Sequence, residues 1–370
     1  MNIEELIPEN IRKLKPYVAG KTIAEVMEIY KPDKISKLAS NENRLGFSPL
    51  VRNAITDIMD NLQDYPDPVS HKLRKKLAHF HGVKNEEILI AAGSESLISV
   101  ICRTFFKEKE YAITADATFV GFFVQAGVRG IQVEKIPITK DFKFDVPGIL
   151  QAVKKGVKIV YIANPNNPTG TYITKPEFEY LINHIPEDVL LIADEAYYEY
   201  AKDVEDYPRA LENRKKNVII LRTFSKAYGL AGLRVGYGIA HRDLITQMSK
   251  TRLTFEPTTF AQAAAFAALD DTEFIEKSVK RVREGREKLY SFFDEHNVQY
   301  VKSICNSVLM VCNDSETAAK FTQSMLVQGV ILRRVQAFGL PNCIRITIGT
   351  EEEMKHFEKS FLNITEEIYS

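Results

Sequence analysis

The sequence predicts an α/β protein whose mostly parallel sheet is covered by helices, followed by a smaller α+β domain. From about residue 85 onward, short apolar runs alternate with helical patterns, which is typical of buried parallel strands. The five clearest runs are Ile88–Ala91, Tyr111–Thr114, Lys158–Ala163, Val189–Ala193 and Val218–Leu221. The length of 370 residues also favours more than one domain, because it exceeds what a single small core needs.

The later part of the chain has a different pattern. The run Val235–Ala240 follows its predecessor too closely for a crossover helix, so we expect an antiparallel or irregular strand there. A charged helical pattern at about 271–296 then leads into strands expected near 307–311 and 343–348. The predicted organisation is an N-terminal arm packing on the small domain (1–35), a large domain (36–265) and a small α+β domain (266–370).

Composition excludes several classes of protein. Lys plus Arg and Asp plus Glu both number 49, so overall charge indicates neither nucleic-acid binding nor binding to a lipid surface. Four scattered cysteines lack the spacing of a zinc site or of a disulfide framework, so we expect no metal. The chain shows no signal peptide and no apolar stretch of membrane length, which predicts a cytoplasmic protein.

Polar residues follow four of the predicted strands. Ligands of open α/β sheets bind outside the carboxyl ends of the strands, so these residues are expected to lie at one edge. They are Gly93-Ser94 at a helix start, the turn from Asn164 to Gly170, Asp194-Glu-Ala-Tyr197, and the segment around Lys226.

Residues from three of these groups have a functional interpretation, and two of them also have a purely structural one. Lys226 follows an apolar strand among small residues, where partial desolvation lowers a lysine pKa and makes the amine nucleophilic. Ser94 either helps to cradle a phosphate at a helix start or simply caps that helix. Asp194 follows five apolar residues and needs a cationic or hydrogen-bonding partner, which a structural ion pair would also provide.

Together these residues resemble the fold-type-I aminotransferases that use pyridoxal phosphate, and among them most closely the histidinol-phosphate aminotransferases. The resemblance covers nearly the whole chain, and the order and spacing of the motifs are more specific than any one of them. The matching segments are Leu14–Tyr17, Leu38–Asn43, Tyr65-Pro66, Asn166–Gly170, Asp194–Tyr197, Arg222–Arg234 and Arg345–Gly349.

The resemblance implies a role for each site residue. Lys226 would bind the cofactor covalently and then act as the base. Asp194 would keep the pyridine nitrogen protonated, while Asn167 and Tyr197 would hydrogen-bond the phenolate oxygen. The implied cofactor-binding set is Ser94, Glu95, Phe119, Asn167, Asp194, Tyr197, Thr223, Ser225, Lys226 and Arg234, with Tyr65 supplied by a second subunit. The resemblance therefore also implies a homodimer with shared active sites.

Substrate anions are expected at two arginines. Arg345 lies inside an apolar strand and needs an anion if it faces inward, although alternation also permits it to face outward. Arg333 is the expected second site, with its neighbour Arg334 as a competing candidate. Tyr17, which could equally anchor the arm, and Asn43 complete the expected substrate-binding set.

The implied activity is transfer of an amino group between glutamate or 2-oxoglutarate and histidinol phosphate or imidazole-acetol phosphate, a step of histidine biosynthesis. An aromatic amino acid aminotransferase is the nearest alternative, and a phosphothreonine decarboxylase is a more distant one. Arg44, which stands where the resembling proteins usually have proline, and Glu256 bear on substrate choice. A nucleotide-binding dehydrogenase is disfavoured because the glycines of 229–238 follow the lysine instead of opening the first helix. A non-catalytic regulator is a further alternative.

Overall fold

The computed structural model describes residues 3–14 and 20–369, and its largest layer is a seven-stranded sheet. The strands lie in the order β2-β8-β7-β6-β5-β3-β4, and β8 runs antiparallel to both of its neighbours. In chain order they are β2 (Ile88–Ala91), β3 (Tyr111–Ala115), β4 (Val133–Ile136), β5 (Val157–Ala163), β6 (Leu190–Asp194), β7 (Val218–Thr223) and β8 (Gly236–Ile239). The mostly parallel sheet and the antiparallel strand at Val235–Ala240 are therefore confirmed.

Helices cover both faces of this sheet, and each face has its own apolar core. One core includes side chains of α4 (His71–His81), α7 (Val146–Ala152), α8 (Lys175–His184) and α11 (Thr259–Ala268). The other includes side chains of α5 (Ser94–Phe105), α6 (Val120–Val128) and α10 (Arg242–Thr251). Because the strands other than β4 are buried on both faces, they are mostly apolar throughout.

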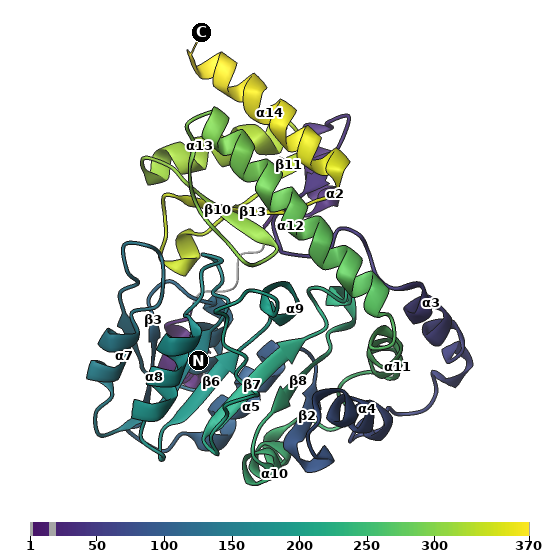
Figure 1. Ribbon diagram of the computed structural model, residues 1–370, viewed down its shortest axis with the longest axis vertical. Helices are drawn as coiled ribbons and strands as arrows, with labels where there is room; N and C mark the ends of the chain where they lie inside the picture. The colour runs from purple at the N-terminus through teal and green to yellow at the C-terminus, as the bar shows by residue number, and fades with distance from the viewer. Residues whose placement is uncertain (1–2, 15–19, 370) are drawn as a thin grey trace.

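The smaller layer is an antiparallel sheet of order β12-β13-β10-β9. Its strands are β9 (Gln299–Val301), β10 (Ser307–Val311), β12 (Arg333–Arg334) and β13 (Cys343–Thr347). Helices α13 (Ser315–Val327) and α14 (Glu351–Tyr369) pack against this sheet at the opposite end of the molecule from α10 (Figure 1). The strands expected near 307–311 and 343–348 are confirmed.

Helix α12 (Thr272–Glu295) joins the two layers. The carboxylate of Asp271 accepts a hydrogen bond from the backbone amide of Phe274 at 2.9 Å and thereby caps the helix. Ile275 and Val282, in its first half, belong to a core of the large sheet, whereas Leu289 and Phe293 belong to the core of the small sheet. One helix thus contributes to two cores.

The N-terminal part of the chain contacts both layers. Helix α1 (Glu9–Arg12) lies against α6, while α2 (Ile23–Tyr30) buries Val26 beside Leu326 of α13. Strand β1 (Ser36–Lys37) pairs in parallel with β11 (Val330–Ile331). The remaining α-helices of residues 3–14 and 20–369 are α3 (Pro49–Thr56) and the short α9 (Tyr198–Ala201).

The division of the chain at residues 35/36 and 265/266 stays a prediction, and α11 continues across the second of these points. In the described part of the chain, no helix has both the length and the apolar character that a membrane span requires.

Candidate active site

Two adjoining cavities lie at the carboxyl ends of the parallel strands. The larger has a volume of about 680 Å³ and the smaller of about 120 Å³. Both are lined by Glu95, Phe119, Asn167, Tyr197 and Lys226. The two spaces therefore meet at Lys226, the residue that the sequence singles out as nucleophile.

The smaller cavity gathers every cofactor-binding residue that the sequence predicts within one chain. Besides the five shared residues, its walls include Ser94, Asp194, Thr223, Ser225 and Arg234. They come from the start of α5, the ends of β6 and β7, and the loop that leads into β8. Residues up to 140 positions apart in sequence thus face one space of 120 Å³.

Lys226 lies in the loop after β7, with its amine exposed to the cavities. The amine donates a hydrogen bond to the carbonyl oxygen of Ser40 at 3.3 Å. Burial lowers the pKa of Lys226 to about 8, and the positive charge of Arg345 acts in the same direction. About a tenth of the amine is therefore uncharged at pH 7, far more than at an ordinary lysine, and the uncharged form is the one that a nucleophile or base requires.

Asp194 ends β6 and is almost completely buried. Its carboxylate accepts hydrogen bonds from the hydroxyl of Tyr161 at 2.7 Å and from the backbone amide of Ala196 at 3.2 Å. Burial raises the pKa of Asp194 to about 6, while these two donors oppose that rise. The carboxylate is thus mostly ionised at neutral pH and can pair with a cationic group in the cavity.

The wall of the smaller cavity also contains hydrogen-bond donors for an anion. Helix α5 begins at Ser94 directly after Gly93, whose φ of 88° lies in the region that favours glycine. A Cβ atom at Gly93 would lie 2.8 Å from Nη2 of Arg234, so the glycine lets the guanidinium approach the helix start. Arg234 also donates to the hydroxyl of Ser225 at 3.2 Å. A helix N-terminus, hydroxyls and a permanent cation suit a phosphate.

Two aromatic side chains line both cavities together with Lys226. The ring of Phe119 folds back over Gly121, where a Cβ atom would lie 2.5 Å from that ring. Tyr197 accepts a hydrogen bond on its hydroxyl oxygen from the side-chain amide of Asn41 at 2.9 Å. Gly121 therefore leaves space for the Phe119 ring and Asn41 holds the hydroxyl of Tyr197, and both rings line both cavities.

The larger cavity presents two arginines on one face of the small sheet. Arg333 and Arg345 are direct partners in the antiparallel pairing of β12 with β13, so their side chains project from the same face. Both line the cavity. Arg345 donates to Asn167 Oδ1 at 2.5 Å and to the carbonyl oxygen of Ala39 at 2.7 Å. Because like charges directly opposite each other repel, a bound anion would relieve that repulsion.

The structure does not bring all the predicted residues together. Arg334 pairs with Ile344 and donates to Ser315, so it faces away from Arg333. Asn43 is not in the wall of either cavity, because its amide donates to the carbonyl of Ala227 and to Ser278, each at 2.8 Å. Tyr65 is 80% exposed and outside both cavities, and Tyr17 lies outside the described residues.

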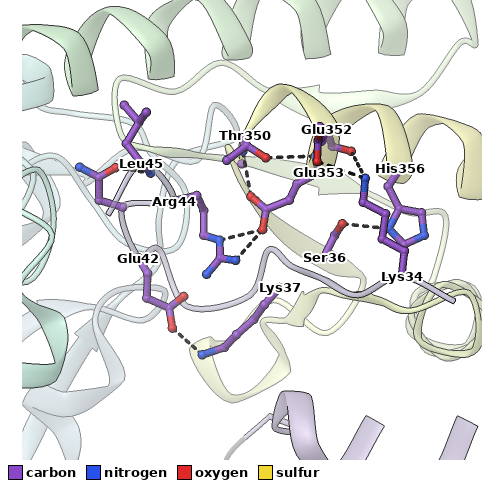
Figure 2. Close-up of polar contacts among 12 residues, drawn as sticks. Lys34, Ser36, Lys37, Glu42, Arg44, Leu45, Thr350, Glu352, Glu353 and His356 are labelled. Atoms are coloured by element: carbon purple, nitrogen blue, oxygen red, sulfur yellow. Dashed lines mark hydrogen bonds and ion pairs between the residues drawn. The ribbon is translucent and has the colours of Figure 1, made fainter. Parts of the chain in front are cut away.

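The segment that carries Arg44 is tied to neighbouring elements by ion pairs (Figure 2). Lys37 pairs with Glu42 at 2.5 Å, and Arg44 pairs with Glu353 of α14 at 2.6 Å. The Arg44 side chain points toward Glu353 and is absent from the described walls of both cavities. The ion pair of Arg44 with Glu353 therefore connects this segment to α14.

The sequence matches the model of the family "Aminotransferase class I and II" over residues 33–361, which is most of the chain. The chain belongs to the class I and II aminotransferases. Two relatives of this aminotransferase are named histidinol-phosphate aminotransferase. The protein of Anoxybacillus flavithermus is 39% identical over 363 residues (98% of this chain and 97% of the relative), and that of Bacillus subtilis strain 168 is 40% identical over 349 residues (94% and 96%).

A solved structure is also similar to this aminotransferase. The histidinol-phosphate aminotransferase of Sinorhizobium meliloti, in complex with pyridoxal-5'-phosphate, superposes with a TM-score of 0.90 at 27% identity, with 98% of each chain covered. The predicted fold class, aminotransferase activity and pyridoxal phosphate cofactor are therefore confirmed.

The smaller cavity of this aminotransferase has the donor set that pyridoxal phosphate needs. A buried carboxylate at Asp194 suits the ring nitrogen, and the amine of Lys226 suits the aldehyde. The helix start at Ser94, with Arg234 beside it, suits the phosphate group. The residues present fit the group, and Gly93 leaves room for Arg234 at the helix start where the phosphate would bind.

Some residues of this aminotransferase's site were not predicted from the sequence. Tyr161 contacts Asp194 from behind, and the backbone carbonyls of Ala39 and Ser40 orient Arg345 and Lys226. A tyrosine inside an apolar strand carries no signal of its own, because core tyrosines are common. The only usable sign would have been its position two residues before the end of a strand next to that of Asp194.

Proposed function

We propose that this aminotransferase exchanges the amino group between glutamate or 2-oxoglutarate and histidinol phosphate or imidazole-acetol phosphate, as a step of histidine biosynthesis. The observation that carries the proposal is the pair Arg333 and Arg345 on one sheet face, opening into the same cavity as Lys226. The names of the relatives at about 40% identity support the same substrates.

The arginine pair suits substrates with anionic groups. A guanidinium offers a planar fork that binds a carboxylate or a phosphate through two hydrogen bonds. Glutamate carries two carboxylates, and a phosphate monoester carries between one and two negative charges at neutral pH. Because Arg345 is already oriented by Asn167 and Ala39, it can bind an anion without losing much side-chain freedom.

Asp194 and Lys226 have separate roles at the reacting atoms. When bound, pyridoxal phosphate supplies an aldehyde carbon that accepts the amino group and a ring that withdraws electrons from the substrate. Asp194 holds a proton on the ring nitrogen, which increases that withdrawal. The amine of Lys226 takes the proton from the substrate's α-carbon and later returns a proton, because it lies where the two cavities meet.

A comparison of amino donors tests the substrate assignment. We expect a higher kcat/KM for histidinol phosphate than for phenylalanine or tyrosine, with 2-oxoglutarate as acceptor and glutamate formation as readout. The variant Arg333→Gln should lower kcat/KM for histidinol phosphate by about 10- to 100-fold, since a charged hydrogen bond contributes roughly 1.5–3 kcal/mol.

Arg334→Gln is the matched control, because Arg334 is adjacent in sequence but faces Ser315. Its kinetics should stay close to those of the parent. Faster turnover of the aromatic amino acids would replace the proposal with an aromatic amino acid aminotransferase. Equal effects of the two substitutions would mean that Arg333 does not meet the substrate.

The proposal includes a homodimer in which Tyr65 reaches the partner's active site. Its ring stacks on Phe255 at 4.4 Å and is 80% exposed in the single chain. Other large apolar side chains nearby in sequence are also exposed, and such surfaces mark protein–protein contacts. These are Phe47 (42%), Leu50 (42%), Met59 (54%), Leu62 (64%) and Val69 (53%).

Mixing two inactive variants tests the shared site. Lys226→Ala and Tyr65→Ala subunits are each expected to be impaired as homodimers. In a symmetric dimer with crossed contributions, each mixed dimer has one intact site, so random exchange of subunits should restore about a quarter of the parent activity. No recovery after confirmed exchange, or a mass near 42.1 kDa in light scattering, would contradict the arrangement.

The proposal also includes a cytoplasmic location. The four cysteines all lie in the described part of the chain, are buried and carry free thiols. Free thiols suit a reducing compartment.

A further inference from the structure

A tyrosine lies directly behind Asp194, outside the cavity walls. Tyr161 is fully buried, and its hydroxyl donates a hydrogen bond to Asp194 Oδ2 at 2.7 Å. Asp194 lines the smaller cavity, whereas Tyr161 does not. Its hydroxyl can therefore act on a bound group through the Asp194 carboxylate.

The register of two parallel strands creates this contact. Tyr161 is opposite Ile192, and Ala163 is opposite Asp194, in the pairing of β5 with β6. Tyr161 and Asp194 are thus diagonal neighbours on the same face of the sheet, within reach of an aromatic side chain. Phe122 of α6 stacks on the Tyr161 ring with centroids 4.3 Å apart and an interplanar angle of 9°, which fixes its direction.

Asp194 needs such a donor because it is buried. Loss of solvation disfavours the carboxylate, and the neighbouring Glu195 adds to this effect. The hydroxyl of Tyr161, the backbone amide of Ala196 and the positive charge of Lys226 act in the opposite direction. Burial and the nearby Asp194 raise the pKa of Tyr161 well above its usual value, so the phenol stays a neutral donor.

We propose that Tyr161 is a positioning residue for the aminotransferase reaction: its hydroxyl holds the Asp194 carboxylate charged and aimed into the smaller cavity, where the ring nitrogen of the cofactor binds. This inference rests on the proposed function only in the role given to Asp194. It does not depend on which amino donor the enzyme uses.

The substitution Tyr161→Phe tests the proposal, because it removes one oxygen and keeps the ring stacked on Phe122. The titration of the Asp194 carboxyl can be followed by carbon NMR in apoprotein labelled at aspartate. We expect its midpoint, near 6 in the parent, to rise by roughly one unit or more, as the loss of a hydrogen bond to a charged group predicts.

Binding of pyridoxal phosphate to the apoprotein gives a second readout. A rise of one unit lowers the ionised fraction of Asp194 at pH 6 from about one half to about one tenth. The affinity for pyridoxal phosphate should therefore fall about fivefold at pH 6, and the difference should shrink as the pH rises. Tyr237→Phe is the matched control, because Tyr237 is an equally buried tyrosine of β8 whose hydroxyl contacts His81 at 2.9 Å instead.

An unchanged Asp194 midpoint in Tyr161→Phe, or an equal shift in Tyr237→Phe, would overturn the proposal. If Tyr161→Phe does not fold, 3,5-difluorotyrosine at position 161 provides the converse test. Its more acidic hydroxyl is a stronger donor and should lower the Asp194 midpoint; no change or a rise would count against the role. Both titrations use apoprotein without amino-acid substrates, so a wrong substrate assignment would leave their outcome unaffected.

Discussion

Replacing Lys226 by alanine is expected to lower kcat by about 10⁴-fold or more while the protein stays folded. The substitution removes both the amine that binds the cofactor aldehyde and the base that moves the proton, and a positioned base alone contributes roughly 10²–10⁴-fold. The measurement is glutamate formation under saturating substrates. Added ethylamine should restore part of the rate, because a small amine can occupy the space that the lysine side chain leaves.

Lys34→Ala is the control for this variant. Lys34 is exposed and its amine contacts Glu352, at 3.4 Å from the carbonyl oxygen and 3.7 Å from the carboxylate, so its removal should leave kcat unchanged. In the parent apoprotein, the rate of pyridoxal phosphate binding should increase as the pH passes about 8, where the Lys226 amine loses its proton. A Lys226→Ala variant with near-normal turnover would rule out the proposed base.

Replacing Asp194 by asparagine is expected to lower kcat by about 10³-fold. The change keeps the size of the side chain but leaves a protonated ring nitrogen in a buried site without its anion, and breaking a buried charge pair costs roughly 3–5 kcal/mol. The cofactor should also dissociate during gel filtration, which absorbance of the eluted protein would show.

Asp206→Asn is the control for the loss of a carboxylate. Asp206 accepts a hydrogen bond from the hydroxyl of Tyr172 at 2.6 Å on the exposed surface, and its replacement should leave both kcat and cofactor retention unchanged. If Asp194→Asn turned over within threefold of the parent, Asp194 could not be the partner of the ring nitrogen.

The large sheet could be predicted from the sequence because buried parallel strands are nearly continuous apolar runs. The segments after β6 and β7 carry Asp194 and Lys226, and topology places the carboxyl ends of such strands together. The edge strand β4 was missed, because Val133-Glu-Lys-Ile136 has apolar residues only at its two ends and is not buried like the central strands. The other edge strand, β2, was predicted because all four of its residues are apolar and buried. Apolar runs therefore identify buried strands, wherever these lie in the sheet.

The directions of side chains were harder to predict from the sequence than the strands. Arg333 and Arg334 are adjacent, and only the pairing of β12 with β13 shows that Arg333 shares a face with Arg345. Asn43 follows a motif that suggested substrate contact, yet its amide binds Ala227 and Ser278. The direction of Arg333 depends on strand register, and the contacts of Asn43 join residues 184 and 235 positions apart. No local sequence pattern predicts either of them.

The position of Lys226 at the junction of the two cavities has a stereochemical consequence. With the smaller cavity filled, the amine would approach the reacting carbon from the side on which Lys226 lies, in a space that the rings of Phe119 and Tyr197 also line. A proton delivered from one side to a flat carbon atom creates one mirror-image form. The fold of the strand ends therefore determines the handedness of the amine that leaves this enzyme.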